Sequence, residues 1–131
     1  MWPLSIKKNV ISIPTGVRIS IDSLVSPPNM QQMIDAIRAA RKEIYLSKAP
    51  PHLSNTVRDN LIVQYNDATQ ELVNDPGNGF SDYTPPNFHT YFSNNPSEMI
   101  DDLHPDGTGY QSMARLWCES LNGQAGMACT P

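Results

Sequence analysis

Apolar residues recur at helical spacing in three segments of the chain. The first follows Pro27-Pro28-Asn29, since proline is tolerated in the first turn of a helix. The longest begins at Ser54 or Asn55, either of which can cap a helix, and ends at the turn signal Asp75-Pro76-Gly77. The last covers residues 109–121. The spacing predicts three buried faces: Met33, Ile34, Ile37 and Ala40; Val57, Leu61, Ile62, Tyr65, Leu72 and Val73; and Tyr110, Met113, Ala114 and Trp117.

Shorter apolar runs predict β-strands. Residues 17–21 alternate apolar and polar side chains with a period of two. Residues 44–46 follow the first helix and precede Pro50-Pro51, which is typical of a buried strand in a βαβ unit. Because helices alternate with short apolar strands, we predict an α/β layered fold. We divide the chain into an extended N-terminal segment, residues 1–27, and a domain with proline-rich loops, residues 28–131.

Composition excludes several classes of protein. The 131 residues are 39% apolar and only 17% charged, which argues against intrinsic disorder. No apolar run approaches the ~20 residues of a membrane-spanning helix. The net charge is -4 and no stretch concentrates lysine and arginine, so we expect neither a membrane span nor a nucleic-acid partner.

The cysteines leave the cellular compartment open. Cys118 and Cys129 lie close together in the sequence and can form a short disulfide if the chain is secreted, or stay as thiols in a reducing compartment. Residues 1–8 lack the apolar core and the cleavage site of a signal peptide. Neither the scattered histidines nor the aspartates between 101 and 106 have the spacing of a zinc or calcium site, so no metal or other cofactor is expected.

The densest polar chemistry lies in the loop before the last helix, Asp101-Asp102-Leu103-His104-Pro105-Asp106-Gly107. A histidine held in a loop at the rim of a cleft can transfer protons near neutral pH. A carboxylate three residues earlier can reach its other ring nitrogen and fix the tautomer. The plainer interpretation is that His104 is a surface residue and that the aspartates cap the helix.

The pattern Asp101-x-x-His104-Pro105-x-x-x-Gly109-Tyr110 resembles the last motif block of the SGNH, or GDSL-type, esterases and lipases. The resemblance covers about residues 28–121, with a helix-then-strand unit at 30–51 and a long helix at 60–72. It implies a small three-layer, flavodoxin-like α/β fold with a short parallel sheet and about three main helices.

The resemblance also implies a mechanism, in which a serine attacks an ester carbonyl and backbone amides hold the oxyanion. Matched onto this block, His104 is the general base and Asp101 is the carboxylate that orients it. Asp102 is a rival for that second role, although its spacing fits the family less well.

The nucleophile of the family lies in a Gly-Asp-Ser block after the first strand. Here Asp22-Ser23-Leu24 matches that block except that Ile21 replaces the glycine, so Ser23 is the candidate nucleophile. The family's Gly-x-Asn-Asp block has no match, and the chain between Ser23 and His104 is short. The chain is then either a compact relative or the C-terminal half of a longer member in which Asp-Ser-Leu is a coincidence. We favour the second as the history of the sequence, with an incomplete sheet.

We expect a weak carboxylic-ester hydrolase that acts on a small-molecule or lipid ester. The alternative is a non-catalytic half-domain that pairs an open sheet edge with a second copy or another partner. Phe88, Tyr91 and Phe92 either line an acyl pocket or pin down a loop without regular structure. His52 either faces the cleft beside His104 or is an ordinary loop residue.

Overall fold

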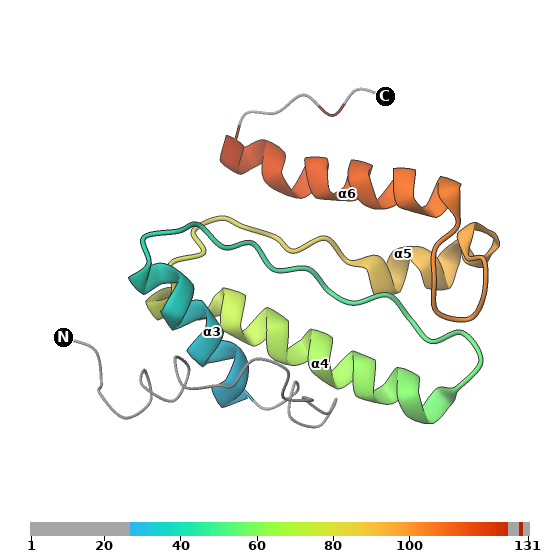
Figure 1. Ribbon diagram of the computed structural model, residues 1–131, viewed down its shortest axis with the longest axis horizontal. Coiled ribbons are helices and arrows are strands. Elements are labelled where there is room, and N and C mark those ends of the chain that lie inside the picture. The colour runs from blue at the N-terminus through green and yellow to red at the C-terminus, as the bar shows by residue number, and fades with distance from the viewer. Residues whose placement is uncertain (1–26, 126–128, 130–131) are drawn as a thin grey trace. The chain divides into compact units, whose positions relative to one another are not determined.

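The computed structural model describes residues 27–125 and 129, and the chain divides into two compact units, Met1–Tyr45 and Leu46–Pro131. All three predicted helices are present, with bounds close to those expected, and none in the described part is long and apolar enough to cross a membrane. The helices labelled in Figure 1, together with two short 3-10 turns, are α3 Pro27–Ala39, α4 Thr56–Asn74, η1 Pro76–Asn78, α5 Phe88–Asn94, η2 Pro96–Glu98 and α6 Gly107–Ala125.

In the first unit, α3 ends in a hydrogen-bonded cap. Its most buried residue, Ile34, is 1% exposed and lies on the predicted apolar face, whereas Met33 on the same predicted face is 48% exposed. Beyond the helix, Arg41 has a left-handed φ of 59°, and the Lys42 N–H donates to the carbonyl of Ile37 at 3.1 Å. This arrangement satisfies a carbonyl that the helix end would otherwise leave unpaired.

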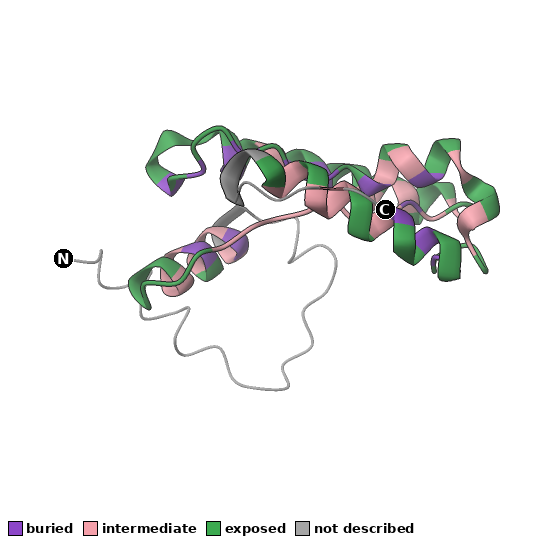
Figure 2. Cartoon of the chain, turned by 90° about the horizontal axis from the view of Figure 1, so that it is seen from above, coloured by how far each residue is buried: buried purple, intermediate pink, exposed green. Residues whose placement is uncertain are grey.

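In the second unit, α4 begins at the asparagine cap that the sequence offers. The side chain of Asn55 accepts a hydrogen bond from the N–H of Arg58 at 3.0 Å. Val57 is 73% exposed, so the predicted buried face is wrong in the first turn. Burial is concentrated in the second half of the helix, at Asn66, Ala68, Thr69, Leu72 and Val73. Figure 2 shows buried residues interspersed with exposed ones along the helices.

The described part of the chain is mostly helical and contains no sheet, so the predicted α/β flavodoxin-like fold with a parallel sheet is wrong. Residues 44–46 are extended without forming a strand. A parallel bridge between Lys48 and Asn87 is isolated and does not continue. Proline explains this: Pro50-Pro51 and Pro85-Pro86 have no N–H to donate, so a ladder cannot extend past the bridge.

Two further predictions depended on a sheet, namely a strand at residues 17–21 and an open sheet edge. The expected strand at residues 17–21 lies outside the described residues. Within the described part there is no sheet, and hence no open sheet edge of the kind predicted.

Side chains, together with the isolated bridge at Lys48, hold the extended segment that precedes α4. The buried amide of Asn66, 5% exposed, accepts from the N–H of Ala49 at 2.6 Å and donates to its carbonyl at 3.1 Å. The hydroxyl of Tyr83 donates to the carbonyl of Leu46 at 2.6 Å. These contacts fix the segment along α4 and lead it toward the start of that helix (Figure 1).

Aromatic residues connect α5 to α6. Phe88 and Phe92 are 2% and 0% exposed, and the rings of Phe88 and Trp117 lie edge to face with centroids 6.1 Å apart. Tyr110, predicted to lie on the buried face of α6, is 57% exposed, while Ser112 is buried. The predicted face of α6 is therefore only partly correct: Trp117 packs against Phe88 and Met113 is half-buried, whereas Tyr110 and Ala114 are exposed.

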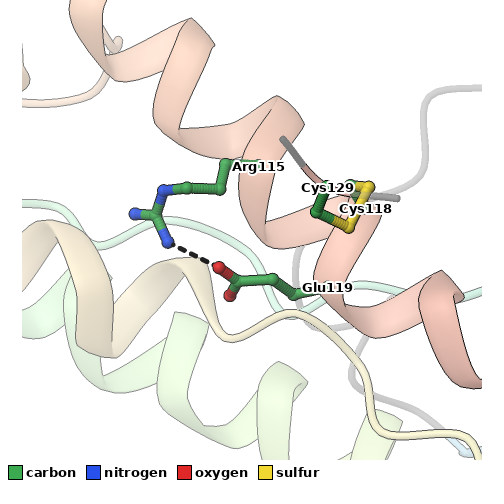
Figure 3. The surroundings of a disulfide bond; sticks show 4 residues. All are labelled: Arg115, Cys118, Glu119 and Cys129. Atoms are coloured by element: carbon green, nitrogen blue, oxygen red, sulfur yellow. Dashed lines mark hydrogen bonds and ion pairs between the residues drawn. A yellow bond between two sulfur atoms is a disulfide. The ribbon is translucent and has the colours of Figure 1, made fainter. Parts of the chain in front are cut away.

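A disulfide joins α6 to the chain that follows it. Cys118 on the helix is bonded to Cys129, eleven residues further along the chain. Figure 3 shows this disulfide beside the exposed ion pair of Arg115 and Glu119, whose closest atoms are 2.9 Å apart. The bond ties the chain after α6 back to the helix.

Candidate functional site

The candidate catalytic histidine lies on a tight hairpin between η2 and α6. The N–H of Asp106 donates to the carbonyl of Glu98, and the N–H of Ile100 donates to the carbonyl of His104, both at 2.8 Å. These two bonds form the stem of a turn whose tip is residues 101–103. The short stem places His104 immediately before α6.

A glycine on α6 allows this hairpin to approach the helix closely. A Cβ atom at Gly109 would lie 2.4 Å from the carbonyl oxygen of Glu98 and 2.7 Å from Cβ of Pro105. The N–H of Gly109 also donates to the carboxylate of Asp106 at 2.8 Å, which caps the start of α6. The glycine of the sequence pattern is thus needed for close packing.

Asp101 organises the tip of the hairpin. One of its carboxylate oxygens accepts the N–H groups of Leu103 and His104, both at 2.7 Å. The same carboxylate lies 2.9 and 3.0 Å from Nδ1 of His104. The hydrogen bond from the Leu103 N–H, followed by those from the side chain and backbone of His104, lowers the pKa of Asp101 from 3.8 to about 2. Asp101 is therefore ionised throughout the neutral range.

This contact fixes the orientation of the imidazole. With its hydrogen on Nδ1 directed to the carboxylate, the neutral ring keeps the lone pair on Nε2. The structure gives Nε2 no hydrogen-bond partner among the described residues, and the His104 side chain is 64% exposed. The ring can therefore accept a proton from an incoming hydroxyl, and Asp101 would stabilise the imidazolium that forms.

The structure distinguishes between the two aspartates that were candidates for orienting His104. Asp101 contacts His104, whereas the carboxylate of Asp102 accepts a hydrogen bond from the hydroxyl of Ser54. The N–H of Leu53 also donates to the carbonyl of Asp102 at 3.0 Å. The hydroxyl of Ser54 is thus bonded to Asp102 and not to His104.

The other residues singled out in the sequence lie elsewhere. Ser23 lies outside the described residues. Phe88 and Phe92 are almost fully buried, which favours their role in holding the α5 segment over that of lining an acyl pocket. The hydroxyl of Tyr91 donates within a cluster formed with Glu98 and Ser112, at 3.0 Å from each.

A second histidine–aspartate pair was not found from the sequence. Nε2 of His89 on α5 lies 3.0 Å from the carboxylate of Asp59 on α4, and both side chains are mostly buried, at 21% and 27% exposed. The same carboxylate accepts the N–H of His52 at 2.9 Å. Ring atom Nδ1 of His52 is buried and has no hydrogen-bond partner among the residues that the structure describes. Since Asp59 and His89 are thirty positions apart, no local spacing indicates the pair.

Comparison of the chain with protein-family models, with curated proteins and with solved structures gave no match.

Proposed function

We propose that this chain hydrolyses carboxylic esters, with His104 as general base, Asp101 as the orienting carboxylate and Ser23, which lies outside the described residues, as the candidate nucleophile. The observation that carries the proposal is the contact between Nδ1 of His104 and an ionised Asp101 at 2.9 Å, which leaves Nε2 exposed for a substrate reaction. The resemblance of the Asp-x-x-His-Pro block to the SGNH esterases supports the same assignment.

In the proposed reaction the serine oxygen attacks the ester carbonyl carbon while its proton moves to Nε2 of His104. Collapse of the tetrahedral intermediate breaks the bond to the alcohol, which leaves with the proton from His104. Water then attacks the acyl-serine by the same route and releases the carboxylic acid and the free serine. The negative charge of Asp101 stabilises the imidazolium in both halves of the reaction.

The proposed activity is slow. The sequence has no match to the Gly-x-Asn-Asp block that holds the oxyanion in the family it resembles. Deletion of a single oxyanion donor lowers the rate by ~10²–10³ in well-studied hydrolases. We therefore expect measurable hydrolysis of activated esters, such as p-nitrophenyl acetate, and little hydrolysis of unactivated ones.

The test combines covalent labelling with kinetics. The protein and its variants His104→Ala, Asp101→Asn and Ser23→Ala are treated with a fluorophosphonate probe and assayed with p-nitrophenyl acetate. We expect wild-type labelling at Ser23, with labelling and hydrolysis lost in His104→Ala and Ser23→Ala. Ser93→Ala, an exposed serine on α5, is the matched control. Equal hydrolysis in the wild type and His104→Ala would exclude the proposal.

A second candidate function is non-catalytic self-association. Several large apolar side chains are exposed in two segments that hydrogen bond to each other around Asp102, namely Leu53, Val57, Ile100 and Leu103, at 38–73% exposure. Such surface favours contact with a second copy or another partner. Light scattering tests it: a mass above the 14.6 kDa of one chain, restored to that value by Ile100→Asp, supports this candidate.

A further inference from the structure

The tip of the hairpin is tethered to a distant part of the chain through one residue. Asp102 accepts the N–H of Leu53 on its carbonyl and the hydroxyl of Ser54 on its carboxylate. Asp102 is the direct neighbour of Asp101, and the two serve different partners. Asp101 therefore organises the turn internally, while Asp102 connects that turn to the residues before α4.

The hairpin needs such a connection. Its tip, residues 101–103, is exposed, and so are both members of the Asp101–His104 pair. Exposed backbone with few packed neighbours opens easily, and the hydrogen bonds that Leu103 and His104 donate to Asp101 would open with it. Asp101 orients the imidazole only while the turn is closed, so contacts from outside the turn help to keep that orientation.

The other end of the tether is firmly held. Asn55, next to Ser54, caps α4 through the N–H of Arg58. The N–H of His52 donates to Asp59, which also pairs with His89 on α5. Ser54 thus lies between His52 and Asn55, whose hydrogen bonds hold the backbone on either side of it. The hydroxyl that it donates to Asp102 therefore comes from a well-held segment.

We propose that Asp102 and Ser54 are positioning residues, which hold the Asp101–His104 turn in the geometry that proton transfer requires. The consequence for catalysis rests on the proposed ester hydrolysis, but the positioning itself does not. The two carboxylates of the Asp101-Asp102 pair therefore have separate roles, one on the imidazole and one on the tether.

Amide hydrogen exchange of the full chain tests the positioning without reference to activity. In Ser54→Ala and Asp102→Ala, the amides of Leu103 and His104 are expected to exchange about two- to tenfold faster, the range for loss of one exposed hydrogen bond. Amides in the middle of α6 are expected to keep their wild-type rates. Ser54→Thr retains a hydroxyl and should restore slow exchange, and Ser93→Ala is the control for loss of a serine elsewhere.

Two results would overturn the proposal. One is exchange at Leu103 and His104 in Ser54→Ala that equals the rate in Ser93→Ala. The other is an equal acceleration throughout the second unit, which would mean general destabilisation instead of local positioning. The kinetic arm uses p-nitrophenyl acetate, where Ser54→Ala should lower kcat by a similar factor with KM unchanged. A wild type without hydrolysis would refute the proposed function, while the exchange rates would still decide the role of the tether.

Discussion

The buried amide of Asn66 offers the sharpest test of how this fold is held together. Asn66 is 5% exposed and makes both of its hydrogen bonds to the backbone of Ala49, across seventeen positions of sequence. The substitution Asn66→Ala removes the two bonds and leaves the N–H and C=O of Ala49 without these partners. It also leaves the extended segment before α4 without its central attachment.

The expected cost follows from these contacts. Each lost hydrogen bond contributes ~0.5–1.5 kcal/mol net, and polar groups left unpaired away from water add ~1–3 kcal/mol. Because Ala49 is only half-buried, water reaches part of the gap, and we expect a total of about 2–4 kcal/mol. That is a large part of the ~5–15 kcal/mol by which a typical domain is stable.

Urea unfolding followed by far-UV circular dichroism measures this effect. With a denaturant dependence of ~2 kcal/mol per molar, which is in the middle of the usual range, the midpoint of Asn66→Ala should fall by about 1–2 M. Asp67→Ala, at the next and exposed position of α4, is the control and should stay within ~0.5 kcal/mol of the wild type. If the two variants unfold at the same urea concentration, the account of how the extended segment is held is incorrect.

Four further outcomes test other parts of the structure. Gly109→Ala should lower the free energy of unfolding by about 1–3 kcal/mol, because the added methyl group would meet the backbone of η2. Gly107→Ala is the control in the same urea assay. It should be neutral or stabilising by up to ~1 kcal/mol, because there is open space around its Cβ position. Arg41→Gly should stabilise the first unit by about 0.5–1 kcal/mol, since φ is 59° there; a thermal melt that shows no gain would contradict this. The pKa of Asp101 is lowered to about 2, so its ionised form stabilises the folded state above the ordinary pKa of 3.8, and this contribution is lost as the pH falls through the folded value. The stability difference between the wild type and Asp101→Asn should therefore shrink on acidification over this range, and a constant difference would refute it. Reduction of the disulfide, which closes an eleven-residue separation, should lower stability by about 2–3 kcal/mol, as urea midpoints with and without dithiothreitol would show.

Features that depend on near neighbours were predictable. The helices follow from apolar spacing, caps and breakers within a few residues, as in Asn55 at the start of α4. The contact between Asp101 and His104 was also accessible, because a carboxylate three residues before a histidine needs only a tight turn to reach it. The role of Asp102 was not, since its partner Ser54 is forty-eight positions away.

The failure of the α/β prediction has a specific cause. Residues 44–46 have the composition of a strand, but a strand also needs a partner that can continue a ladder. The two proline pairs interrupt that ladder, and the free backbone groups bond to Asn66 and Tyr83 instead. The apolar composition of residues 44–46 does not show whether such a partner exists.

The sequence by itself determined where the chain coils into helices and where it must break, and it placed two candidate carboxylates, Asp101 and Asp102, close to His104, because each of these depends on residues a few positions apart. The tertiary structure decided which helix faces are covered, how the extended segment before α4 satisfies its backbone, and which distant serine holds the turn beside His104. Those outcomes depend on hydrogen bonds and packing between residues brought together only when the chain folds, so their energies are not encoded in any local pattern.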